Sequence, residues 1–294
     1  MAAPHDRHAY RFIDRLLRTV LHLLPPSQLT QKAALSWGYR YRPPPRIIRL
    51  RSGLRFNYEA VDFIPLMLYY TGVFEPTLLR YLNAILKPGG TVIDIGANIG
   101  FHTLEFWKAV GKRGRVISIE ASPEHAAATC RNLQANDLPV DDVINLAVGD
   151  HDGEVSLGLP SGGNQGMFGV NAGDESAFTV ALRRIDDLLA PRQLSGIDLI
   201  KIDIEGSELG ALRGAEATLS RYRPAILIEL NDSALARCGA SSSEVVSLLS
   251  DAGYQGWVVG HGVARPIIGG SPHECDECLF LPADAAELRR RLKL

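Results

Sequence analysis

An acidic residue and two glycines follow one another closely in the segment VIDIGANIG, residues 92–100. Gly96 allows a tight turn, and Gly100 lets the start of a following helix approach a ligand. The first turn of that helix offers backbone N–H groups and the positive end of a dipole. Asn98 stands where a dinucleotide fingerprint has its middle glycine, so the loop better suits a ligand with a carboxylate and an ammonium group. Asp94 would face the cation. A tight turn without a ligand is the alternative.

Glu120 ends the next apolar segment along the chain. A carboxylate at this point of a strand–helix–strand unit can accept hydrogen bonds from two ribose hydroxyls. A single glutamate at a strand end is otherwise a solvated charge. Because Glu120 follows the glycine loop at the expected spacing, we favour the ribose interpretation.

A third group of charged residues lies in the segment DLIKIDIEG, residues 198–206. Strand alternation would place Lys201, Asp203 and Glu205 on one face. Charges at the end of a buried strand are costly unless they are paired or used, so this is either an ion-pair network or a reactive group. Glu229 ends the following apolar segment and is expected to point into the same crevice. These carboxylates could hold Mg²⁺ or Ca²⁺, but no histidine lies beside them in the sequence and we expect no metal.

Strands that alternate with helices are expected to position these residues. Several segments are short and almost wholly apolar, as in strands buried on both faces. Such an alternation predicts a parallel, doubly wound α/β sheet, whose ligand crevice lies at the carboxyl ends of the strands. Helices are expected at 75–86, from the glycine loop to about 110, and at 123–136. The interval 151–178 is rich in Gly, Ser and Asn and is expected to be an irregular binding loop. The expected strands are 91–95, 115–120, 143–148, 197–204, 225–230, 254–259 and 278–281.

The N-terminal part has a different character. Residues 8–24 predict a helix with apolar residues at helical spacing and arginines elsewhere on the wheel, ended by Pro25 and Pro26. This helix either packs on the main domain or lies on an anionic membrane or a partner. Two short strands are expected at 46–50 and 54–57.

Composition narrows the classes of protein. The 294 residues carry 31 Lys and Arg against 33 Asp and Glu, a balance that does not support nucleic-acid binding. Four cysteines are too few for a disulfide scaffold, and the lone pair Cys275 and Cys278 makes a poor zinc site. A reducing, cytoplasmic location fits this usage. No apolar run reaches the length of a membrane span, and Arg15 and Arg18 interrupt the N-terminal apolar stretch, which argues against a signal peptide.

These motifs, in this order, resemble the FkbM family of S-adenosylmethionine-dependent methyltransferases. The resemblance covers residues 92–231, and KIDIEG is its most specific part. It implies a Rossmann-like class I methyltransferase fold, with a seven-stranded, mostly parallel sheet, a reversed last hairpin and helices on both faces. Residues 1–85 would form an N-terminal helical and β extension, and residues 86–294 the methyltransferase domain. The matching segments are VIDIGANIGFHTL, ISIEASPE, RIDD, DLIKIDIEGSELGALRGA and RPAILIEL.

The resemblance also implies a site and a reaction. The reaction would be O-methylation of a hydroxyl on a sugar, glycolipid or polyketide-type small molecule, by in-line transfer with a carboxylate base. We favour Asp203 or Glu205 as the base with Lys201 orienting it; the other candidates are Glu229 and His102. The cofactor S-adenosylmethionine would contact Asp94, Gly96, Ala97, Asn98, Gly100, Glu120, Ala121 and Asp203.

Two other functions share part of this pattern. An NAD-dependent oxidoreductase has the same strand, glycine and acid geometry but is disfavoured by Asn98. A catalytically inactive methyltransferase-like binding module is the other alternative, and the intact acidic residues argue against it. The acceptor and the oligomeric state are not indicated by the sequence.

Overall fold

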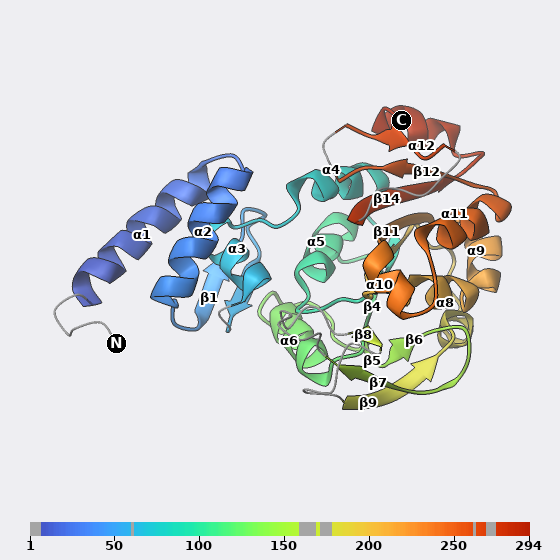
Figure 1. Cartoon of the computed structure of the whole chain (residues 1–294), viewed down its shortest axis with the longest axis horizontal. Helices are drawn as coiled ribbons and strands as arrows, with labels where there is room; N and C mark the ends of the chain where they lie inside the picture. Colours follow the sequence, from blue (N-terminus) through green and yellow to red (C-terminus); the bar gives the residue numbers. More distant parts are fainter. Residues whose placement is uncertain (1–6, 60–61, 159–168, 171–177, 261–262, 269–274) are drawn as a thin grey trace. The chain divides into compact units, whose positions relative to one another are not determined.

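The computed structural model divides the chain into two compact units (Figure 1). One unit comprises the residues up to 76 together with 134–137, and the other comprises 77–133 and 138–294. The residues that the structure describes are 7–59, 62–158, 169–170, 178–260, 263–268 and 275–294.

The first unit contains three helices and a hairpin. Helix α1 and helix α2 pack together and against α3, and strands β1 and β2 pair antiparallel. The predicted first helix and the two short strands are confirmed. Helices α2 and α3 were not predicted, because α3 is apolar on nearly every side and shows no helical period. The bounds are α1 (Arg7–Leu23), α2 (Gln28–Tyr41), β1 (Arg46–Arg49), β2 (Arg55–Tyr58) and α3 (Phe63–Thr71).

The second unit is built on an eight-stranded sheet in the order β13-β12-β14-β11-β10-β3-β4-β5. Five neighbouring strands run parallel to one another: β11, β10, β3, β4 and β5. Strand β14 runs antiparallel to β11 and to β12. The expected seven strands with a reversed last hairpin are confirmed, and the two-residue β13 adds to the edge. The bounds are β3 (Thr91–Ile95), β4 (Arg115–Glu120), β5 (Val143–Asn145), β10 (Leu199–Ile202), β11 (Ala225–Asn231), β12 (Tyr254–Val258), β13 (Arg265–Pro266) and β14 (Cys275–Pro282).

The two faces of this sheet differ in chemistry. One face carries isoleucines such as Ile93 and Ile200, which form a buried core with leucines such as Leu212 of helix α8. The opposite face packs against helix α5. It carries Asp94 and Lys201, which alternate along their strands with the isoleucines of the first face. The helices of this unit are α4 (Pro76–Ile85), α5 (Phe101–Val110), α6 (Pro123–Gln134), α7 (Ile185–Leu189), α8 (Glu208–Arg213), α9 (Glu216–Tyr222), α10 (Asp232–Arg237), α11 (Ser242–Asp251) and α12 (Ala286–Leu292).

A second, four-stranded sheet in the order β6-β9-β7-β8 was not predicted. The expectation of an irregular loop over 151–178 is wrong for β7 and β8, and its remainder at 159–168 and 171–177 lies outside the described residues. The first four residues of β7 alternate between half-buried and exposed, and only the last two are buried. The strand therefore lacks the long apolar run that predicts the strands of the main sheet. The bounds are β6 (Ala147–Val148), β7 (Gly153–Gly158), β8 (Gly169–Val170) and β9 (Phe178–Arg183).

Within the described ranges, no helix combines the length and the hydropathy that crossing a membrane requires.

Candidate active site

The glycine loop brings the carboxyl ends of β3 and β10 together. Gly96 has a φ of +79°, and a Cβ built there would lie 1.8 Å from the carbonyl oxygen of Asp203. The N–H groups of Gly96 and Ala97 donate to the Ile119 carbonyl oxygen at 2.9 and 3.1 Å. Since any side chain at Gly96 would collide with backbone, only glycine permits this approach.

Helix α6 holds the rest of the loop in place. Asn98 adopts a φ of +51°, and its side-chain oxygen accepts a hydrogen bond from the Ile99 N–H at 2.7 Å. The carbonyl oxygens of Asn98 and Ile99 accept hydrogen bonds from Thr129 and Asn132, each at 2.7 Å. Gly100, with a φ of +81°, begins α5 without a side-chain cap. The loop is therefore shaped by protein contacts and needs no ligand to hold it.

Glu120 lies beside this loop at the end of β4. Its two carboxylate oxygens accept hydrogen bonds from the N–H groups of Asn98 at 2.7 Å and Ser122 at 2.8 Å. Burial raises the pKa of Glu120 to about 7, even though both hydrogen bonds favour the ionised form. A carboxylate accepts about four hydrogen bonds, so capacity remains for two ribose hydroxyls. The neighbouring Ala121 is fixed through its carbonyl oxygen, which accepts a bond from Asn145 at 2.9 Å.

Asp94 is the central acid on the α5 face of the sheet. It is fully buried, and the Thr103 hydroxyl donates to one of its oxygens at 2.6 Å. Burial raises its pKa, and the nearby Lys201 charge opposes that shift. Within the part of the chain that the structure describes, no hydrogen bond reaches its other oxygen. A buried acceptor with a missing donor at this end of the sheet fits a ligand that carries an ammonium group.

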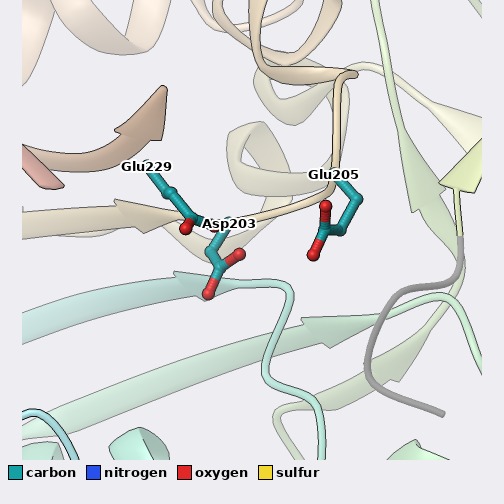
Figure 2. A group of neighbouring side chains, drawn as sticks. All are labelled: Asp203, Glu205 and Glu229. Carbon is teal, nitrogen blue, oxygen red and sulfur yellow. The ribbon is translucent and has the colours of Figure 1, made fainter. Parts of the chain in front are cut away.

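Three carboxylates meet at the ends of β10 and β11. Asp203, Glu205 and Glu229 each place a carboxylate oxygen within 4.8 Å of the others (Figure 2). Lys201 is almost fully buried, and its ammonium group lies 2.9 Å from a carboxylate oxygen of Asp203. Although burial opposes ionisation, the Lys201 charge and hydrogen bonds to Lys201 and Glu229 hold the pKa of Asp203 below its usual value. Asp203 is therefore a stably ionised group.

Glu205 reaches the same place by a different backbone path from the predicted one. The expected strand at 197–204 is shorter in the structure, where β10 ends at Ile202. The strand alternation expected to place Glu205 beside Lys201 and Asp203 is therefore wrong, and Glu205 has a φ of +52°. Burial and the nearby Asp203 charge raise the pKa of Glu205. An unfavourable backbone conformation that aims an acidic side chain into a charged group is typical of functional sites.

Glu208 shapes this turn and was not predicted. Its carboxylate accepts hydrogen bonds from the N–H groups of Ile204 at 3.2 Å and Gly206 at 3.0 Å. Burial raises its pKa to about 7. An acidic residue in the first turn of α8 is a recognised signal of a helix start, and that signal could have found it.

His102 lies in the first turn of α5 and is buried. Its ring is 5.1 Å from that of Phe101 and 6.2 Å from that of Phe106. It lies close enough to Asp94 and Asp203 to influence the pKa of both acids, opposing the rise at Asp94 and adding to the lowering at Asp203. The structure thus brings all the predicted site residues to one end of the sheet.

Comparison with known proteins adds family information. The family model described as the methyltransferase FkbM domain matches residues 94–255, more than half of the chain. The 2-O-methyltransferase NoeI of Sinorhizobium fredii is 26% identical over 175 residues, which cover 52% of this chain and 70% of NoeI. The methyltransferase sdnD of Sordaria araneosa is 27% identical over 195 residues, covering 55% and 73%. A crystal structure of a methyltransferase FkbM from Methylobacillus flagellatus matches at 17% identity with a TM-score of 0.41. That match covers 94% of this chain and 59% of that one.

Proposed function

The chain belongs to the FkbM methyltransferase family, and from this premise we propose that it methylates a hydroxyl group of a sugar, glycolipid or polyketide-type small molecule. Its cofactor is S-adenosylmethionine, which supplies a methyl group already made electrophilic by the sulfonium. The protein must therefore bind the cofactor, align an acceptor oxygen and remove its proton. Each task has candidate residues at the carboxyl end of the sheet.

The cofactor is assigned to the loop that follows β3. Glu120 would accept the ribose hydroxyls with its remaining lone pairs, and Asp94 would receive the ammonium group. Gly96, Ala97, Asn98 and Gly100 would provide the backbone surface beside the cofactor, with Ala121 next to Glu120. This assignment rests on the hydrogen-bonding capacity that remains on the Glu120 carboxylate and on the Asp94 oxygen that accepts no bond from the described residues.

The observation that supports a hydroxyl as the methyl acceptor is the cluster of three carboxylates formed by Asp203, Glu205 and Glu229. A hydroxyl must lose its proton as the new bond forms, and an efficient general base has a pKa near the working pH. Burial and the nearby Asp203 charge raise the pKa of Glu205 from its usual value toward that range. Asp203 is ionised through Lys201 and fits an orienting role. We therefore assign Glu205 as the base and Asp203 as the positioning group. Glu229 forms a hydrogen bond with Asp203 and helps to hold it in place.

Similarity to NoeI supports the choice of a hydroxyl, because that relative is named as a 2-O-methyltransferase. Family membership argues against the oxidoreductase alternative. We keep residues 1–85 as an N-terminal extension and 86–294 as the catalytic domain, and we place the protein in the cytoplasm. All three assignments are part of the proposal.

Calorimetric titration with S-adenosylhomocysteine, run beside NADH, tests the cofactor assignment. We expect the first ligand alone to bind, and Glu120→Ala to bind it more weakly. Binding of neither ligand would favour the inactive module, and binding of NADH alone would contradict the proposal.

Transfer of a radiolabelled methyl group to a panel of sugars, glycolipids and hydroxylated polyketide-type compounds tests the reaction. An alkali-stable methyl ether is the expected product, whereas labelling of amines or carboxylates alone would refute the hydroxyl acceptor. Glu205→Gln should abolish turnover while S-adenosylhomocysteine still binds. Turnover that survives in Glu205→Gln but not in Asp203→Asn would reverse the two roles.

A further inference from the structure

Helix α1 turns an apolar face away from the unit to which it belongs. Phe12, Leu16 and Leu23 are 69%, 54% and 78% exposed, and their spacing places them on one side of the helix. The opposite side carries Asp14 and Leu21, which are buried. The amphipathic helix is thus inverted relative to the usual arrangement, in which the apolar face packs inward.

Specific contacts fix α1 in this orientation. The hydroxyl groups of Tyr69 and Tyr70 donate to the two carboxylate oxygens of Asp14 at 2.8 and 2.6 Å. The Arg51 guanidinium donates to the carbonyl oxygens of Leu21 at 3.1 Å and of Leu24 at 2.7 Å, near the end of the helix. Because a buried polar side and a capped end hold the helix, rotating its apolar face inward would break these bonds.

The exposed apolar side chains are concentrated in this unit. Among the described residues, only Val263 and Ile268 are large, exposed and apolar outside it. A concentrated apolar patch of this kind marks an interaction surface, whereas scattered single residues do not. The others are Phe12, Ile13, Leu16, Val20, Leu23, Leu24, Leu29, Tyr39 and Ile47.

A cationic cavity of about 600 Å³ lies on the same helix. Its charged lining is Asp14 and four arginines, with Tyr41, Pro44 and Tyr69 beside them. Asp14 is already bonded to two tyrosines, and in the described ranges no ion pair engages any of the four guanidinium groups. The cavity therefore carries a net positive charge. The arginines are Arg11, Arg15, Arg18 and Arg46.

We propose that α1 lies on an anionic phospholipid surface, with its apolar face in the acyl boundary and a lipid phosphate in the arginine cavity. Guanidinium groups bind phosphate through paired hydrogen bonds. A helix with one apolar face and arginines along its polar side lies in the plane of a bilayer interface. A second copy of the chain would cover the apolar face equally well but would leave the arginine cavity unexplained. The inference is independent of the methyl acceptor.

Co-sedimentation of the full-length chain with vesicles tests this proposal. Binding is expected to vesicles that contain phosphatidylglycerol and to be much weaker with phosphatidylcholine alone. Each arginine near an anionic surface contributes about fivefold in partitioning, so Arg11→Gln with Arg15→Gln should weaken binding by about 25-fold. Phe12→Glu with Leu16→Glu should abolish it. These side chains are exposed, and circular dichroism would confirm that the variants are folded.

Two matched controls come from the other unit. Ile268→Glu replaces an apolar side chain that is even more exposed than Phe12 and Leu16, and Arg290→Gln removes an exposed arginine. Both should bind vesicles as the unmodified protein does. Equal loss in these controls would refute a specific surface on α1.

Other occupants give other results. Calorimetric binding of inorganic phosphate or pyrophosphate that depends on Arg15, without vesicle binding, would identify a site for dissolved phosphate compounds and overturn the lipid proposal. A dimer seen by light scattering that Phe12→Glu dissociates, again without vesicle binding, would show that a second copy covers the face. Failure of the protein to bind either kind of vesicle would also refute the lipid proposal.

Discussion

The raised pKa of Glu120 makes cofactor affinity depend on pH. The cofactor's ribose hydroxyls donate hydrogen bonds, so they need the ionised carboxylate that also accepts from Asn98 and Ser122. With a pKa of about 7 in the free protein, much of Glu120 is protonated below neutrality. Binding must then release a proton, and affinity should rise with pH until the group is fully ionised.

The size of the effect follows from that pKa. The fraction of ionised Glu120 rises from about one tenth at pH 6 to about nine tenths at pH 8, so the dissociation constant should fall about tenfold across this interval. Above pH 8 it should level off. The same shift acts on folding in the opposite direction, because the folded protein without cofactor holds this proton more tightly than the unfolded chain. Its free energy of unfolding should therefore decrease as the pH rises from about 4.5 to about 7.

Calorimetry with S-adenosylhomocysteine between pH 6 and pH 8, in buffers of different ionisation enthalpy, measures both affinity and proton release. Glu120→Gln should bind more weakly and show a flat pH profile. Glu208→Gln is the matched control, because Glu208 is a second buried glutamate with a pKa of about 7 that accepts from backbone at the β10 turn. A pH profile that persists in Glu120→Gln and disappears in Glu208→Gln would refute the assignment.

Three further predictions concern the framework of the site. Gly96→Ala should cost several kcal/mol in thermal unfolding, because its Cβ meets the Asp203 carbonyl, whereas Gly89→Ala, with φ +88° and open space, should cost about 1 kcal/mol; equal losses would contradict the collision argument. Thr103→Val should destabilise by about 2 kcal/mol, because the Thr103 hydroxyl is the one side-chain donor to buried Asp94 among the described residues. Thr103→Ser should restore stability if the hydroxyl is responsible. Methyl transfer should survive extensive dialysis against EDTA, because Lys201 already neutralises Asp203; loss of activity that Mg²⁺ restores would establish a metal requirement.

Much of the catalytic unit could be predicted because its signals are local. An apolar run buried on both faces, a glycine loop and an acid at each strand end identify β3, β4 and β10 without reference to distant residues. The predicted strand at 143–148 is instead divided into β5 and β6, which join different sheets. That division depends on pairing partners far along the chain, which the residues themselves do not reveal.

The orientation of α1 also depends on residues that are distant in the sequence. Its sequence predicts an amphipathic helix and is compatible with either face packing inward. The orientation is determined by Tyr69 and Tyr70, more than fifty residues away. Their hydroxyl groups donate hydrogen bonds to Asp14 and so stabilise its buried carboxylate. An apolar period therefore predicts the helix, whereas the exposed face depends on which polar residue finds a buried partner.

The identity of the base illustrates why residue types alone cannot rank equivalent carboxylates. Asp203 and Glu205 are both acidic and two residues apart, and an extended strand would give them the same surroundings. The turn after Ile202 instead places Asp203 against the Lys201 ammonium and leaves Glu205 near a like charge. The first contact lowers the pKa of one acid, while burial and the neighbouring Asp203 charge raise the pKa of the other. The division between an orienting anion and a proton acceptor thus arises from the backbone at Glu205, whose φ of +52° no pattern of residue types predicted.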